Sequence, residues 1–98
     1  MYFASAERSK HLELFREFVE AVWRNRTPEE ARQRWRELKR SAAALEALRA
    51  LAYLASSPPP HLAGIIAAAG GPKLAQSAAL PWLISLEREY REVYAELG

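Results

Sequence analysis

Residues 58–72 read PPPHLAGIIAAAGGP, and this stretch decides the fold. Its prolines stop one helix and pre-set the backbone for entry into the next. Gly70 and Gly71 end that helix, and Pro72 opens another. We therefore predict a short helix over about 59–69, free of charge and made mostly of Ala, Gly and Ile. Small residues inside a core leave room, and either another backbone or a ligand fills it.

Apolar residues recur at intervals of three and four on both sides of this stretch, and no segment alternates with a period of two. The pattern predicts further helices over about 5–25, 28–56 and 72–97. Residues 27–30 (TPEE) mark the start of the second helix, with Thr at the cap, Pro at the first helical position and Glu placed to complete a capping box. A short link joins the first two helices, so we expect them to be antiparallel neighbours.

Pro81 falls inside the last predicted helix. A fresh helix start at Pro81 would place Leu80 at the N-cap, where leucine is disfavoured. We therefore expect one continuous helix, in which Pro81 removes the hydrogen bond to the Ser77 carbonyl and causes a kink. The fold class that follows is all-α: a four-helix bundle with a short third helix and a proline-kinked fourth helix. A short helix beside a kink is expected to leave a cavity.

Length, composition and charge narrow the functional classes. The 98 residues make one domain, 1–98, which is long enough to bury a core. The absence of Cys excludes disulfides, zinc–thiolate sites and thiol nucleophiles. The net charge of +2 is mild, so we expect no nucleic-acid partner. Proline and glycine breaks in residues 50–86 argue against a membrane span, and residues 1–10 lack the apolar centre of a signal peptide. We expect a cytoplasmic monomer without a membrane partner.

His61 is the candidate metal ligand. A neutral imidazole is a good axial ligand for haem iron, and Gly64 and Ala68 follow one and two helical turns after His61. Because such a smooth face could lie flat against a porphyrin, haem is the expected cofactor in this interpretation. The alternative is a surface His in the first turn of a helix. His11 could be a second ligand opposite His61, or a partly buried His at a helix end.

An internal, mainly apolar pocket is expected between the short helix, the kinked helix and the first helix. Pockets of this kind combine apolar walls with a few placed polar groups. The alternative is that Gly64 allows close helix packing and that the serines near Pro81 satisfy backbone carbonyls. The predicted ligand-binding set comprises Phe15, Tyr53, His61, Gly64, Ile65, Ala68, Ser77, Trp82 and Ser85.

Three functions remain open. The leading hypothesis is a module that binds a small molecule or cofactor in this pocket, haem being the most concrete case. The second is an enzyme that uses the same pocket, either with haem or with Lys73 as an amine nucleophile; its catalytic residues are otherwise unknown. The third is a protein–protein interaction module, in which exposed faces of Ala and Gly pair with another chain.

Basic residues cluster around the link between the first two predicted helices: Arg24, Arg26, Arg32, Arg34, Arg36, Lys39 and Arg40. Such a cluster could bind phosphate or nucleic acid. Glu29, Glu30 and Glu37 dilute its charge. We therefore interpret it as a solvated, salt-bridged end of the bundle.

The chain resembles computationally designed helical bundles. The resemblance rests on the TPEE start at 27–30, the EREYRE alternation at 87–92 and the stop at Gly98, where propensity, caps and pattern agree. Arg outnumbers Lys and residues 1–3 (MYF) are irregular, which departs from that style. The resemblance implies a bundle made to hold a small molecule or a porphyrin, with its departures from ideal geometry introduced on purpose. We recognise no natural family in any segment.

Overall fold

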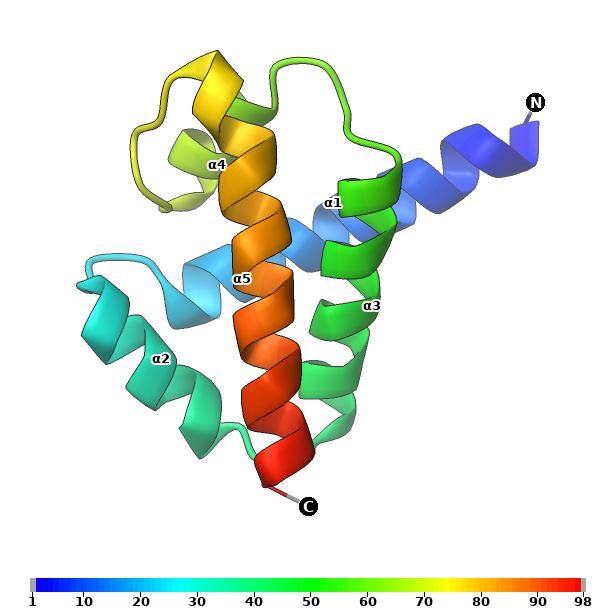
Figure 1. The fold of residues 1–98 in the computed structure, drawn as a ribbon. Coiled ribbons are helices and arrows are strands. Elements are labelled where there is room, and N and C mark those ends of the chain that lie inside the picture. The colour runs from blue at the N-terminus through cyan, green and yellow to red at the C-terminus, as the bar shows by residue number, and fades with distance from the viewer. Residues whose placement is uncertain (1, 98) are drawn as a thin grey trace.

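A computed structural model describes the backbone of residues 2–97 and the side chains of residues 6–97. Over this range the chain folds into five α-helices without a strand (Figure 1). The helices are α1 (Tyr2–Val22), α2 (Pro28–Glu37), α3 (Ala42–Ser56), α4 (Leu62–Ala69) and α5 (Gln76–Glu96). The all-α prediction is thereby confirmed. Gly98, the predicted stop, lies outside the described residues.

The predicted helix over 28–56 is wrong, because α2 and α3 replace it. Between them Lys39 has a φ of 54°, a left-handed conformation through which an α-helix does not continue. Ser41 then caps α3, since its Oγ accepts a hydrogen bond from the Ala44 N–H at 3.2 Å. The described part of the chain therefore has five helices where the sequence predicted four.

The core lies where α3 packs against α1 on one side and against α5 on the other (Figure 1). α3 and α5 run in opposite directions, and α2 and α4 cover the other side of α5. Large side chains that are fully buried at this meeting point include Phe15, Val19, Leu51, Leu54 and Leu83. Among the described side chains the buried ones are all aliphatic or aromatic. The hydrophobic effect therefore supplies the main driving force for the packing of the helices.

Pro81 lies inside α5, as predicted. Because proline has no backbone N–H, the Ser77 carbonyl loses its usual helical donor. Both residues are exposed, so this interruption lies on the solvent side of the helix. The kink itself stays a prediction.

α4 occupies the short segment that the sequence predicted, starting slightly later. His61 has a φ of 59° and no capping hydrogen bond from its side chain, so the helix begins only after it. Gln76 supplies a partner from α5 instead: its Oε1 accepts a hydrogen bond from the Ala63 N–H at 3.3 Å. Gly70, with a φ of 112°, ends α4 in the left-handed conformation that glycine adopts most readily.

The glycines after α4 permit a close approach to neighbouring atoms. A Cβ atom on Gly70 would lie 2.9 Å from the Cβ of Arg24, just beyond α1. A Cβ atom on Gly71 would lie 2.7 Å from Cγ2 of Ile66. In Gly70 and Gly71, the missing side chain therefore allows the backbone to pack against neighbouring residues and does not make room for a ligand.

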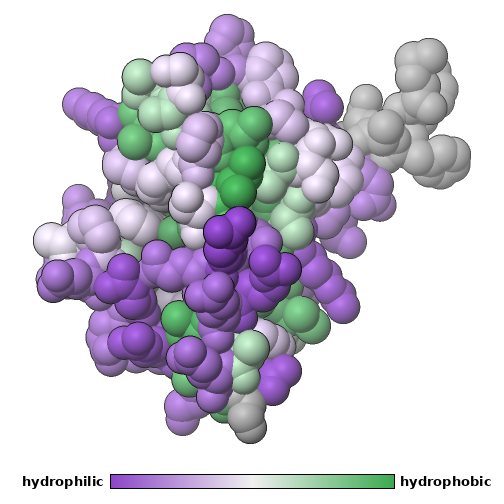
Figure 2. Space-filling model, in the orientation of Figure 1, coloured by the Kyte–Doolittle hydropathy of each residue, from purple (hydrophilic) through white to green (hydrophobic). Residues whose placement is uncertain are grey.

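The surface is mixed in character. Figure 2 shows apolar surface gathered over the upper part of one face, where α5 begins, and hydrophilic surface below it. Ile84 and Leu97, which are 44% and 39% exposed, are the large apolar side chains most open to solvent among the described residues. Isolated residues of this kind are normal on a protein surface. None of the described helices has the length and apolar character needed to cross a membrane.

Candidate functional site

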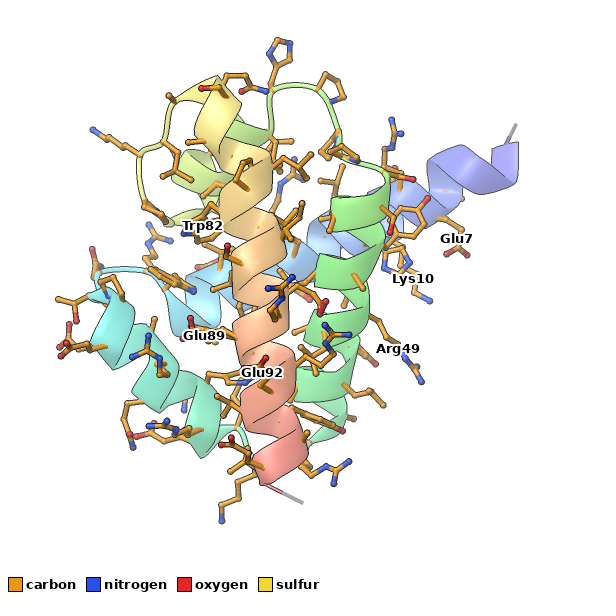
Figure 3. All side chains as sticks on the ribbon, in the orientation of Figure 1. Glu7, Lys10, Arg49, Trp82, Glu89 and Glu92 are labelled. Atoms are coloured by element: carbon orange, nitrogen blue, oxygen red, sulfur yellow. The ribbon has the colours of Figure 1, made fainter. Side chains whose placement is uncertain are left out.

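A cleft of about 200 Å³ opens between α2 and α5, beside the turn that follows α1. We call it the aromatic cleft. One wall comes from a single helix, α5, and consists of Trp82, Ser85, Leu86, Glu89 and Tyr90. The other wall consists of Trp23, the residue that follows α1, and of Pro28 and Arg32 from α2. Figure 3 shows Trp82 and Glu89 on the side of α5 that faces α2.

The spacing of the α5 residues explains why they share one wall. They follow Trp82 at intervals of three, four, seven and eight residues, which places them on one face of a helix. The same face carries on into the core through Leu86 and Tyr90, both of which are buried. Ser85 and Glu89 lie nearer the edge of this face, so the cleft is apolar inside and polar at its rim.

A capping box fixes the start of α2 and with it the position of Pro28. The Thr27 N–H donates to Oε1 of Glu30 at 2.8 Å, and the Glu30 N–H donates to Oγ1 of Thr27 at 3.2 Å. The TPEE prediction is confirmed. The bonds from the backbone and the side chain of Thr27 lower the pKa of Glu30, because they favour the carboxylate.

Three aromatic rings join α2 to the rest of the molecule below the cleft. Trp35 stacks on Tyr90, with ring centroids 4.9 Å apart and planes inclined by 28°. Phe18 of α1 meets both rings edge-on, at 5.8 Å from Trp35 and 5.7 Å from Tyr90. Contacts of this kind hold aromatic rings in a fixed geometry. The inner end of the aromatic cleft is therefore built on a rigid cluster.

Trp23 and Trp82 form the aromatic part of the walls. Their ring centroids are 5.5 Å apart and their planes meet at 69°, an edge-to-face arrangement. Trp23 is 8% exposed, whereas Trp82 is partly open to solvent. Two planes at this angle form a corner, so an occupant of the cleft would contact aromatic carbon on two sides.

An ion pair crosses the rim of the cleft. Nε of Arg32 donates to Oε1 of Glu89 at 2.5 Å, with side chains that are 38% and 42% exposed. This hydrogen bond raises the pKa of Arg32, and the negative charges of Glu89 and Glu29 act in the same direction. The charged side chains that line the cleft are thus one guanidinium and one carboxylate, which pair with each other.

Two buried polar atoms at the cleft lack hydrogen-bond partners within the described part of the chain, Nε1 of Trp23 and the hydroxyl of Tyr90. Burial raises the pKa of Tyr90, and the charge of Glu89 raises it further. The indole N–H of Trp23 lies near enough to offset part of this rise, yet the two atoms do not form a hydrogen bond of normal geometry. A buried polar atom left unpaired costs about 1–3 kcal/mol, so each of these two atoms calls for an explanation.

The structure brings together only two of the predicted ligand-binding residues at this cleft, Trp82 and Ser85. Phe15 is fully buried in the core. Tyr53 lies on α3, where its ring stacks on His11 with centroids 4.2 Å apart. The remaining members lie on or next to α4 and at the start of α5, namely His61, Gly64, Ile65, Ala68 and Ser77.

The side chains of α4 face two ways. Ile65 is partly buried against the core, whereas Gly64 and Ala68 are exposed. A Cβ atom added to Gly64 would meet no atom within 4 Å, so neither helix packing nor a cavity wall accounts for this glycine. Neither the aromatic cleft nor the apolar groove described below is lined by a residue of α4.

His61 is exposed at the start of α4. Over the described residues, no three side chains of His, Cys, Asp or Glu come together in a way that could hold a metal ion. Axial haem ligation needs only one such side chain, so the role of His61 stays a prediction. His11 contacts Glu7 instead, with Nε2 3.4 Å from Oε2.

A second concave surface, which we call the apolar groove, lies between α1 and α3 and has a volume of about 180 Å³. Its lining is mainly aliphatic and includes Phe18, and its polar residues are Glu17 and Glu46. Unlike the aromatic cleft, it contains no tryptophan and no buried polar atom without a partner.

Three of the seven residues of the basic cluster form ion pairs. Arg24 pairs with Glu20 at 3.2 Å, Arg34 pairs with Glu37 at 3.4 Å, and Arg32 pairs with Glu89 across the cleft. The first two pairs join residues three or four apart in the sequence and are exposed, so they contribute little to stability. The third joins two helices that are far apart in the sequence.

The sequence analysis missed six cleft residues: Trp23, Pro28, Arg32, Leu86, Glu89 and Tyr90. The helical spacing from Trp82 to Tyr90 was a usable signal for the α5 wall. No comparable signal existed for the opposite wall, because it depends on where α2 lies in space.

No protein-family model, curated protein or solved structure matches this chain. The function therefore has to be argued from the geometry of the chain itself.

Proposed function

We propose that this protein binds a small, mainly apolar organic molecule in the aromatic cleft. The observation that carries the proposal is the corner formed by Trp23 and Trp82, which has two unpartnered buried polar atoms beside it. Apolar walls with a few convergent polar groups are the usual composition of a small-molecule site. The proposal keeps the leading hypothesis of the sequence analysis and moves the site away from α4.

The size of the cleft limits the ligand. Pockets that enclose drug-sized molecules measure roughly 300–1,000 Å³. The aromatic cleft, at about 200 Å³, is smaller, which favours a compact ligand or one group of a larger molecule. A porphyrin exceeds this volume. Haem held by His61 would therefore require a separate site around α4, and it stays a prediction.

The other hypotheses also stay predictions. Lys73 is exposed in the segment between α4 and α5 and does not line the aromatic cleft. Gly64 and Ala68 form an exposed small-residue face on α4, which is the surface that the interaction hypothesis requires. The resemblance to designed bundles supports a binding role without identifying the ligand.

Ligand titration followed by amide NMR tests the proposal. Indole, choline and the neutral isostere of choline, in which carbon replaces the ammonium nitrogen, are added separately to the isotope-labelled protein. At least one probe is expected to shift amide signals around Trp23, Pro28 and residues 82–90, with a Kd of the order of millimolar. Absence of such localised shifts with all three probes would overturn the proposal.

Variants of two half-buried aromatic residues on α5 provide the control. Trp82→Leu removes one face of the corner and is expected to weaken binding of the responding probe at least about tenfold. Tyr94→Leu removes an aromatic ring of α5 that does not line the cleft, and it is expected to leave the affinity unchanged. Equal losses in the two variants would contradict the location of the site.

A further inference from the structure

We propose that the group held in the aromatic cleft is a methylated ammonium, such as a quaternary or trimethylated amine. The inference rests on the proposed function and specifies its ligand class. It is drawn from the aromatic corner, the Glu89 carboxylate at the rim and the small number of hydrogen-bond acceptors in the lining.

The aromatic corner offers the kind of surface that binds cations. A cation is attracted to the negative face of an aromatic ring, and tryptophan is the best of the natural side chains for this interaction. The planes of Trp23 and Trp82 meet at 69°, so they enclose a cation from two directions, which a stacked pair could not do. Tyr90 adds a third ring at the base of the cleft, where it is only 1% exposed.

The rim of the cleft carries a carboxylate beside the aromatic rings. Arg32 is the guanidinium of the cleft, and its Nε already donates to Glu89. Glu29 is close enough to stabilise the charged form of Arg32 as well. Within the lining, Glu89 and Arg32 balance each other, so the entrance has no net positive charge that would repel a cation, and Glu89 is its negatively charged side chain.

Glu89 can act on a ligand while it remains paired. Its bond to Arg32 engages Oε1. A carboxylate has about four lone-pair positions on its two oxygens, so one hydrogen bond does not exhaust its capacity. Glu89 lines the cleft on the same helix face as Trp82, which places a negative charge beside the aromatic corner.

The composition of the lining favours a methylated ammonium over a free one. A free ammonium carries three N–H donors, each of which needs an acceptor when it leaves water. Apart from the Glu89 carboxylate, the acceptors among the lining side chains are the Ser85 hydroxyl near the rim and the Tyr90 hydroxyl, which is buried. A fully methylated ammonium has no N–H donor to satisfy, and its methyl groups pack against indole carbon. A trimethylammonium head is also compact enough for a cleft of about 200 Å³.

A comparison of the affinities for choline and for its neutral isostere separates the effect of charge from the effect of shape. The two molecules share almost the same outline, so the wild-type protein alone provides the comparison and no variant has to fold. We expect choline to bind at least about fivefold more tightly, a ratio that corresponds to a partly desolvated cation–π contact. The methyl signal of bound choline is expected to shift upfield in the NMR spectrum because the indole rings lie beside it.

Two glutamates of α5 make a matched pair of variants. Glu89→Gln keeps the size of the side chain and removes its charge, and it is expected to lower the affinity for choline at least about threefold with little effect on the isostere. Glu92→Gln makes the same change at an exposed position of α5 that does not line the cleft, and it is expected to change neither affinity (Figure 3).

The outcomes distinguish this inference from the proposed function. Equal affinities for choline and the isostere would overturn the ammonium assignment and leave the small-molecule site in place. Binding of indole without binding of choline would also overturn the ammonium assignment and leave the small-molecule site in place. If none of the three probes binds, both proposals fail. A choline preference that survives Glu89→Gln unchanged would remove Glu89 from the assignment.

Discussion

The indole of Trp35 donates a hydrogen bond from Nε1 to the backbone carbonyl of Tyr90 at 3.1 Å while its ring stacks on the Tyr90 ring. A single side chain thus joins α2 to α5 through both a polar and an apolar contact. Trp35 is 1% exposed, so its hydrogen bond is formed away from water. This contact holds the two walls of the aromatic cleft in a fixed relation.

Replacing Trp35 tests this role. Trp35→Ala leaves a large cavity and is expected to lower the free energy of unfolding by about 3–5 kcal/mol. Trp35→Phe keeps an aromatic ring but loses the indole N–H and some volume, so a loss of about 1–2 kcal/mol is expected. Chemical denaturation measures both values. A loss below 1 kcal/mol for Trp35→Ala would show that α2 is held mainly by other contacts.

Tyr90→Phe, unlike the Trp35 variants, is not expected to lower the free energy of unfolding. The variant removes a buried hydroxyl that has no hydrogen-bond partner among the described residues, so no bond is lost. At neutral pH we expect the free energy of unfolding to stay the same or to rise by up to about 1 kcal/mol. A clear loss of stability would mean that the hydroxyl makes a favourable contact with Trp23.

Tyr90→Phe should also change how the free energy of unfolding depends on pH in alkaline solution. The pKa of Tyr90 is raised above its ordinary value of 10.0, mainly by burial, so above this pH the unfolded chain releases the proton while the folded chain keeps it. The contribution of Tyr90 to stability is therefore complete below pH 10 and is lost as the pH rises further. The stability of the wild type is expected to fall relative to Tyr90→Phe by up to about 1.4 kcal/mol per pH unit. Parallel stability profiles above pH 10 would contradict this expectation.

Replacing two glycines of the α4 region by alanine should change the free energy of unfolding in opposite directions. Gly70→Ala places a Cβ atom 2.9 Å from Arg24 in a residue whose φ is 112°, and a loss of about 1–3 kcal/mol is expected. Gly64→Ala adds a methyl group to an exposed helical position with no atom within 4 Å, and a gain of about 0.5–1 kcal/mol is expected. Thermal or chemical unfolding of both variants measures the difference. A loss at Gly64 would indicate a contact that the backbone geometry does not show.

The haem hypothesis has its own test. If His61 is an axial ligand, addition of haem is expected to produce a shifted Soret band that His61→Ala abolishes and His11→Ala leaves unchanged. A shift that survives in His61→Ala, or no shift in the wild type, would exclude His61 as the ligand. Because His61 does not line the aromatic cleft, Trp82→Leu is not expected to affect haem binding.

The boundaries of several helices could be predicted because they depend on neighbouring residues. The capping box at Thr27 and Glu30 closes within one helical turn, and Gly70 ends α4 through its own backbone conformation. The break after Glu37 was missed, since the apolar spacing continues through Leu38 and hides it. Ser41 was the available signal, because a serine before an Ala-rich segment is a common N-cap.

The sequence by itself determined the all-α class, the position of α4 and the inclusion of Pro81 in a long helix, because helical spacing, proline and glycine act over a few residues. Only the tertiary structure decided that Trp23 and Trp82, far apart in the chain, meet at 5.5 Å, and that Gly64 faces open space. Those outcomes depend on how α2 and α4 are placed against α5. That placement is fixed by the sum of many contacts across the core, such as the packing of Trp35 on Tyr90, which no local pattern reveals.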